Sequence, residues 1–129
     1  MSGATPPRHL AIRIDRLADY TLATLAGEID FSTHERLEEQ LTGALAATQA
    51  ALIINLADVG FCDSSGLNTF AHLLRQTRAR GVSIVFIGVH GRVATVLEMT
   101  RLREALYVQP DLEAAIRWLE GGPTATSGA

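Results

Sequence analysis

The residues best suited to chemistry lie in the run Phe61–Leu67, which reads Phe-Cys-Asp-Ser-Ser-Gly-Leu. This run follows a buried-strand pattern and precedes a helical one, a junction at which α/β proteins present functional groups. Side-chain oxygens of Asp63 or Ser64 there can accept hydrogen bonds from the free N–H groups of the helix. An exposed hydroxyl at the same place can accept a phosphate, because a helix N-terminus favours added negative charge. The run therefore leaves two roles open, a helix cap and a regulatory phosphorylation site.

Other residues capable of chemistry carry weaker signals. The histidines, which have no metal-ligand spacing, are His9, His34, His72 and His90. Cys62 is the one cysteine, so an internal disulfide and a cysteine-based zinc cluster are excluded, and a small buried side chain is favoured over a redox thiol. Gly88–Gly91 lacks the lysine of a phosphate-binding loop, and Ser64 lies outside any Gly-x-Ser-x-Gly motif. We predict no catalytic residue, no cofactor and no metal.

Composition limits the class of protein. The chain has 129 residues, of which 47% are hydrophobic and 19% charged, enough apolar material for one domain. Its net charge of -3, with both signs interspersed, argues against direct nucleic-acid binding. No apolar run approaches the ~20 residues that cross a bilayer, so we expect no membrane insertion. The N-terminal residues lack the pattern of a secretory signal, which predicts a cytoplasmic location.

The two ends of the chain contain few large apolar side chains that a core could bury. Residues 1–9 and 121–129 consist largely of small residues, polar residues and prolines. We predict that both are flexible tails on either side of one domain over residues 10–120.

Alternation and continuous apolar runs predict five strands. Leu10–Ile14 and Tyr20–Thr24 alternate apolar and polar residues, which favours an antiparallel hairpin. Ala51–Leu56 and Ser83–Ile87 are continuous apolar runs, typical of strands covered on both faces. A short last strand is predicted near Ala105–Val108.

Helical spacing of apolar residues predicts about four helices. Ser32 and Glu35 have the spacing of a capping box, which predicts a first helix to about Thr48. Further helices are predicted at Leu67–Leu74, Val93–Leu97 and Leu112–Leu119. Gly81 should end the second helix, and Gly121-Gly122 the last. The order predicts an α/β fold whose mixed β-sheet combines an N-terminal hairpin with parallel strands.

Three segments resemble the STAS-domain proteins of the anti-sigma factor antagonist family. Leu25–Asp30 is similar to that family's Gly-Glu-Leu/Ile-Asp turn, and Phe61–Leu67 resembles its Asp-Ser-Ser/Thr-Gly-Leu phosphorylation loop. Val93–Leu102 resembles the later helix that ends in a Thr-Gly-Leu-like sequence. The resemblance covers about Leu10–Leu119 and implies a single STAS domain.

The resemblance also implies a function and a site. Ser64 matches the family's phosphoacceptor, and Asp30 matches an acidic residue near the phosphorylation loop. The residues expected at the partner-binding surface are Asp30, Asp63, Ser64, Ser65, Gly66 and Asn68. In this bacterial family the unphosphorylated form binds an anti-sigma factor, usually a serine-protein kinase, and so frees a sigma factor for transcription. A serine phosphatase reverses the phosphorylation, and the antagonist itself is not an enzyme.

Two alternatives stay open at this point. The chain could be a non-switching STAS scaffold subunit of a larger complex, such as a stress-sensing particle or a lipid-transport complex, with Ser64 only a helix cap. It could also be a nucleotide-sensing module, which thermal stabilisation by GTP or ATP would reveal.

Overall fold

One mixed sheet of five strands forms the centre of the fold in the computed structural model, which describes residues 10–48 and 50–127. The strands, in their order across the sheet, are β1 (Leu10–Leu17), β2 (Tyr20–Ile29), β3 (Ala51–Cys62), β4 (Ser83–Ile87) and β5 (Tyr107–Gln109). β1 runs antiparallel to β2, and β2 to β5 are parallel to one another. The predicted hairpin and parallel strands are confirmed.

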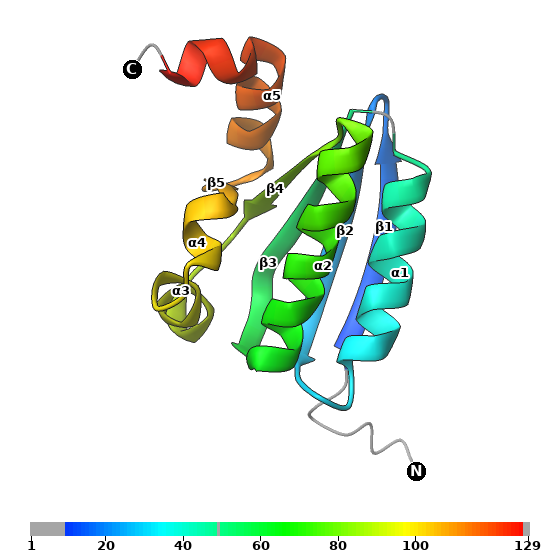
Figure 1. The fold of residues 1–129 in the computed structure, drawn as a ribbon, viewed down its shortest axis with the longest axis vertical. Helices are drawn as coiled ribbons and strands as arrows, with labels where there is room; N and C mark the ends of the chain where they lie inside the picture. The colour runs from blue at the N-terminus through cyan, green and yellow to red at the C-terminus, as the bar shows by residue number, and fades with distance from the viewer. Residues whose placement is uncertain (1–9, 49, 128–129) are drawn as a thin grey trace.

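Helices cover both faces of this sheet. They are α1 (His34–Ala46), α2 (Ser64–Arg80), α3 (Gly91–Glu98), α4 (Leu102–Ala105) and α5 (Leu112–Ser127). α1 and α2 lie side by side over one face (Figure 1). The four predicted helices are present, and α4 is a single additional turn between α3 and β5. None of the helices in the described residues is long and apolar enough to span a membrane.

The buried residues form two clusters, one on each face of the sheet. The larger joins α1, α2 and α3 to the sheet, and within it the rings of Phe70 and Phe86 meet edge to face at 5.0 Å between centroids. The smaller joins β3 and β4 to α5. Ile53 belongs to the smaller cluster and Ile54 to the larger, and both are fully buried. The continuous apolar run of β3 is therefore covered on both faces, as predicted.

An aromatic pair lies beside the smaller cluster. The ring of Trp118, on α5, packs against the ring of Tyr107, on β5, with the centroids 4.8 Å apart. The buried indole N–H of Trp118 has no hydrogen-bond partner within the described part of the chain. This contact fixes α5 against the last strand of the sheet.

The predicted capping box at the start of the first helix is wrong. α1 begins at His34 with Thr33 as its N-cap residue, and Thr33 makes no side-chain capping hydrogen bond. The backbone N–H and the hydroxyl of Ser32 both donate to Asp30 Oδ1, at 2.9 and 2.7 Å. Ser32 therefore stabilises the turn before the helix, which leaves Glu35 without its expected capping partner.

Two predicted boundaries also differ from the structure. β3 continues to Cys62, beyond the apolar run Ala51–Leu56 that predicted it, because Asp58, Val59, Phe61 and Cys62 pair with β2 across two register shifts. α5 continues to Ser127 and does not stop at Gly121-Gly122. A glycine costs a helix only about 1 kcal/mol relative to alanine, which is too little to end it. The predicted tail at residues 1–9 lies outside the described residues.

Candidate functional site

The candidate site begins where β3 passes directly into α2. Only Asp63 separates the two elements, and it takes the extended backbone conformation of an N-cap residue. Its carboxylate accepts a hydrogen bond from the backbone N–H of Ser65 at 2.8 Å. The helix cap predicted for this junction is therefore confirmed, and its side chain is Asp63 rather than Ser64.

Ser64 is the first residue of α2, and its side chain is exposed. Its hydroxyl makes no hydrogen bond to any part of the chain that the structure describes. The backbone N–H groups of a first helical turn carry a partial positive charge, which favours an anion at this place. Asn68 is also exposed, and since it follows by four residues it lies on the same face of α2.

Ser65 and Gly66 are less accessible than Ser64. Ser65 is half-buried, and its carbonyl oxygen accepts a hydrogen bond from the Thr69 hydroxyl at 3.2 Å. Gly66 is buried, and a Cβ atom there would lie 2.5 Å from Ile29 Cγ2 and 2.6 Å from Cys62 Sγ. Gly66 therefore contributes by allowing the start of α2 to lie close against the sheet.

Asp30 opens a tight turn between β2 and α1. Its Oδ1 atom accepts both hydrogen bonds from Ser32, and its carbonyl oxygen accepts from the N–H groups of Thr33 and His34 at 3.1 and 2.9 Å. The buried hydroxyl of Thr33 accepts from Asp30 N at 2.9 Å and donates to the Glu28 carbonyl at 3.0 Å. Several hydrogen bonds thus hold this turn in one conformation.

A backbone hydrogen bond connects this turn to the start of α2. The N–H of Asp63 donates to the carbonyl oxygen of Ile29 at 3.1 Å, immediately beyond the last paired residues of β2 and β3. The turn and the beginning of α2 consequently lie at the same end of the sheet (Figure 1). Asp30 and Ser64, predicted from separate motifs, are brought together there.

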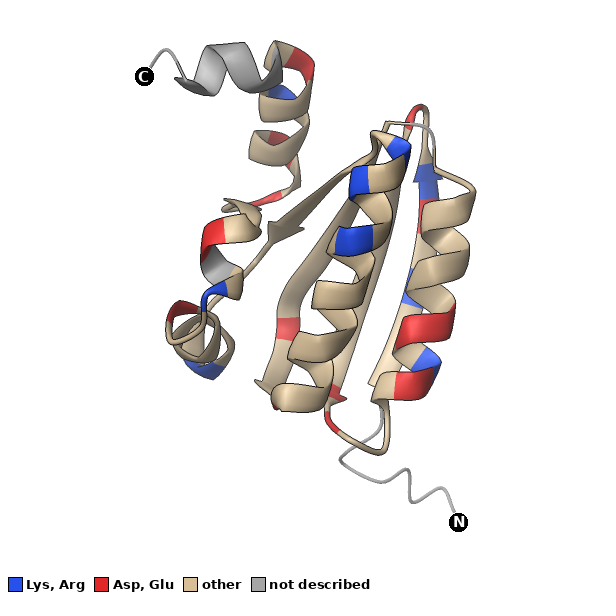
Figure 2. Ribbon diagram, viewed as in Figure 1, with Lys and Arg blue, Asp and Glu red and all other residues tan. Residues whose placement is uncertain are grey.

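The charges at this end of the molecule are mostly negative. Figure 2 shows acidic residues at the end of β2 and along the first turns of α1. The hydrogen bond from the Ser32 hydroxyl holds the pKa of Asp30 below its ordinary value, and backbone N–H groups act in the same direction. Ser64 and the carboxylates of Asp30 and Asp63 therefore lie at the same end of the sheet, where most charges are negative.

The thiol of Cys62 lies beneath this surface. Its side chain is buried, and burial raises its pKa to about 12, with a further contribution from the charge of Asp63. A thiol with so high a pKa stays protonated at neutral pH and is a poor nucleophile. This agrees with the interpretation of Cys62 as a small buried side chain.

Two of the histidines that the structure describes connect secondary-structure elements. His72 Nδ1 lies 3.0 Å from Glu38 Oε2 and so joins α2 to α1, and His90 Nε2 lies 2.7 Å from the carbonyl oxygen of Ala57. The ring of His34 packs against that of Phe31 at 5.3 Å. No group of three potential metal-ligating side chains occurs in residues 10–48 and 50–127.

Sequence reasoning missed two residues of the turn. Thr33 is buried and holds the turn by its hydroxyl, although it reads in the sequence as an ordinary helix-start residue. Phe31 is 80% exposed, which is unusual for so large an apolar side chain. One feature of the sequence could have pointed to Phe31. It is an aromatic residue directly after the Gly-Glu-Ile-Asp run, and it fits neither the strand nor the helix pattern of apolar residues.

Comparison with known proteins places these features in a family. The sequence matches the STAS domain family over residues 11–115. The anti-sigma-B factor antagonist of Staphylococcus aureus is 29% identical over 89 residues, which cover 69% of this chain and 82% of that protein.

Solved structures share the fold. An anti-sigma factor antagonist from Mycobacterium paratuberculosis superposes with a TM-score of 0.76 at 24% identity, over 90% of this chain and 98% of that one. The murine solute carrier 26 family member A9 anion transporter gives a TM-score of 0.74 at 18% identity, over 84% of this chain and 19% of the transporter. At these identities the likeness is one of fold.

Proposed function

Because this chain belongs to the STAS domain family, we propose that it is an anti-sigma factor antagonist whose binding is controlled by phosphorylation of Ser64. Its similarity to the Staphylococcus aureus anti-sigma-B factor antagonist supports the antagonist role. The observation that carries the proposal is the exposed Ser64 hydroxyl at the start of α2, beside the turn that contains Asp30.

The proposed surface consists of Asp30, Asp63, Ser64, Ser65 and Asn68, with the buried Gly66 positioning the helix start. In the unphosphorylated state this surface binds the anti-sigma factor, a serine-protein kinase, and thereby frees a sigma factor. Binding also brings Ser64 to the active site of the kinase, which phosphorylates it. A serine phosphatase then removes the phosphate and restores the active form.

Phosphorylation acts on binding through charge and shape. It adds a charge of about -1.5 to -2 to a surface that already carries two carboxylates. The helix N-terminus favours that charge by about 0.3–1 kcal/mol, so the domain itself stays folded. A partner surface fitted to a neutral hydroxyl meets a bulky anion that is costly to desolvate, and each 1.4 kcal/mol lost weakens binding about tenfold.

The proposal is tested first by phosphate transfer. The purified protein is incubated with Mg-ATP and a lysate of the cells in which the gene occurs, and intact mass and peptide mapping locate any phosphate. We expect one phosphate on Ser64, none on Ser64→Ala, and normal labelling of the control Thr95→Ala, which removes an exposed hydroxyl on α3, outside the proposed surface. The melting temperature of the phosphorylated form should stay close to that of the unmodified protein.

The opposite result would favour a different role. If no growth or stress condition gives a phosphate on Ser64, the switch is wrong and Ser64 is a surface residue of a non-switching subunit. The similarity of the domain to a small part of a murine anion transporter shows that this fold also occurs within larger proteins.

A further inference from the structure

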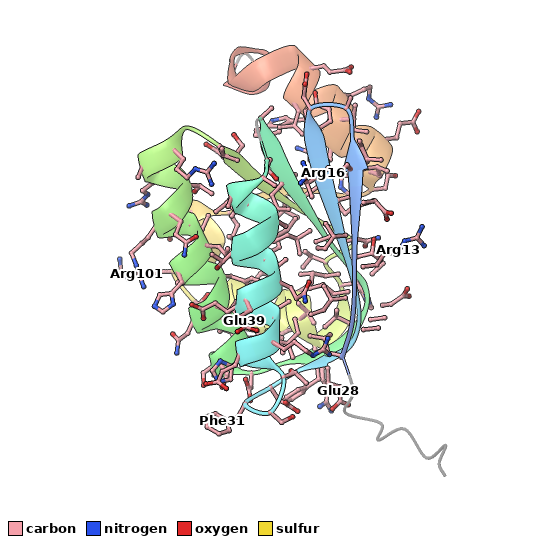
Figure 3. All side chains as sticks on the ribbon, turned by 90° about the vertical axis from the view of Figure 1, so that its right-hand side faces the viewer. Arg13, Arg16, Glu28, Phe31, Glu39 and Arg101 are labelled. Atoms are coloured by element: carbon pink, nitrogen blue, oxygen red, sulfur yellow. The ribbon has the colours of Figure 1, made fainter. Side chains whose placement is uncertain are left out.

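Phe31 is an apolar side chain that the fold leaves in contact with solvent. Among the described residues only Phe31, Met99 and Tyr107 are large hydrophobic residues with exposed side chains, at 80%, 80% and 49%. Figure 3 shows the Phe31 ring projecting away from the ribbon at the end of the molecule where β2 leads into α1. Phe31 belongs to neither core cluster, so its ring does not contribute to the packing of the core.

The backbone that carries Phe31 is held in place. Residues on both sides of it are hydrogen-bonded to one another, since Asp30 Oδ1 accepts from Ser32 and the Thr33 hydroxyl bridges Asp30 N and the Glu28 carbonyl. The ring itself packs on His34, tilted by 38°. An aromatic group fixed in this way loses little conformational entropy when a partner covers it.

Phe31 also lies at the same end of the sheet as the proposed switch. It follows Asp30, and the carbonyl oxygen of Ile29 accepts the hydrogen bond from the N–H of Asp63, the residue before Ser64. A protein that covers the exposed hydroxyl of Ser64 therefore reaches the turn that presents the Phe31 ring. Aromatic residues, phenylalanine among them, are enriched at protein interfaces, and burying such a ring removes a large apolar surface from water.

We propose that Phe31 is the apolar anchor of the partner-binding surface and that it inserts into an apolar pocket on the anti-sigma factor. This inference rests on the proposed function and adds to it the residue that supplies apolar contact area. A phosphate on Ser64, at the same end of the sheet as Asp30, weakens binding. Burial of the Phe31 ring provides affinity in the unphosphorylated state.

The test uses four variants of the full chain. The anti-sigma factors encoded in the source genome are each purified, and binding is measured by calorimetry with Mg-ADP present so that no phosphate is transferred. Phe31→Ala removes the ring, and Phe31→Leu keeps an apolar side chain. Met99→Ala is the matched control because Met99 is equally exposed but lies at the end of α3. Ser64→Asp tests the switch independently of the anchor.

If the inference holds, Phe31→Ala weakens binding at least about tenfold, Phe31→Leu recovers most of the loss, and Met99→Ala stays within about twofold of wild type. With Mg-ATP, Phe31→Ala should raise KM for Ser64 phosphorylation and leave kcat unchanged, which a merely structural role would not produce. All variants should keep the wild-type melting temperature.

Two other results would overturn the anchor and can be told apart. If Ser64→Asp weakens binding but Phe31→Ala does not, or loses no more than Met99→Ala, the anchor alone is wrong. If the wild type binds none of the anti-sigma factors, or Ser64→Asp binds as tightly as wild type, the proposed function fails and the inference fails with it.

Discussion

At Gly66 the start of α2 lies in close contact with the sheet. A methyl group at this position would lie 2.5 Å from Ile29 Cγ2 and 2.6 Å from Cys62 Sγ, both in the core. We predict that Gly66→Ala lowers the free energy of unfolding by about 1–3 kcal/mol, as overpacking usually does. Urea denaturation measures the change.

A second glycine provides the control for that substitution. Gly43 lies in the exposed face of α1, and nothing within 4 Å would meet a Cβ there. Gly43→Ala should therefore stabilise the protein by roughly 0.5–1 kcal/mol through helix propensity. Equal effects of the two substitutions would show that the close contact at Gly66 is relieved without cost.

The lowered pKa of Asp30 should make the free energy of unfolding depend on pH. Its pKa is lowered in the folded state from the ordinary value of 3.8, so the unfolded chain takes up the proton first as the pH falls. The stabilisation from Asp30 is thus fully present at a pH above its ordinary pKa. It is lost as the pH falls through the lowered pKa of the folded state. In urea denaturation between about pH 2 and 6, Asp30→Asn should lack this part of the acid sensitivity.

The Ser32 hydroxyl is the first cause of the lowered Asp30 pKa, and it can be removed separately. In an NMR titration of the Asp30 carboxyl carbon, Ser32→Ala should move the pKa of Asp30 upward toward its ordinary value. An unchanged titration would contradict the assignment of the shift to Ser32.

At the scale of the element, Asp63 sets the start of α2. Its carboxylate satisfies the backbone N–H of Ser65, a donor that the helix itself cannot pair. Asp63→Ala should cost about 0.5–2 kcal/mol of stability by loss of this cap, whereas Asp63→Asn keeps an accepting oxygen and should cost much less. Chemical denaturation of the two variants compares them, and equal losses would argue against capping.

Helix and strand positions were predictable wherever one local signal dominated. Gly81 ends α2 in the left-handed conformation, at φ 71°, as its position in the sequence predicted. Ser32 could not be assigned correctly, because the competing acceptor on Asp30 becomes available only once the turn has formed. The end of β3 was missed because exposed residues such as Asp58 break the apolar pattern while their backbone still pairs with β2.

The candidate site was predictable in its residues but not in its geometry. The motif around Ser64 identified the phosphoacceptor candidate, and the cap at Asp63 followed from residue type and position. The proximity of Gly66 to Ile29 depends on the packing of α2 against β2, which no local pattern encodes. The exposure of Phe31 likewise depends on the path of the turn, so it became visible only in three dimensions.

At the scale of the whole molecule, the sheet is stabilised from both faces. Ile53 and Ile54 are adjacent and fully buried but belong to different clusters, one under α5 and one under α1 and α2. We predict that Ile53→Ala and Ile54→Ala each cost about 2–5 kcal/mol. Guanidinium denaturation should show one cooperative transition for both, and a negligible cost for Ile53→Ala would mean that α5 is not part of the folded unit.

The contact between Trp118 and Tyr107 gives this protein a built-in optical probe. Trp118 is the one tryptophan of the chain, and it lies with α5 against the smaller cluster, whereas Ser64 starts the helix that packs in the larger one. Its emission spectrum therefore reports on the face of the sheet away from α1 and α2. Unchanged emission when Ser64 is phosphorylated would indicate a signal confined to the binding surface, and a spectral shift would reveal that it is transmitted through the sheet.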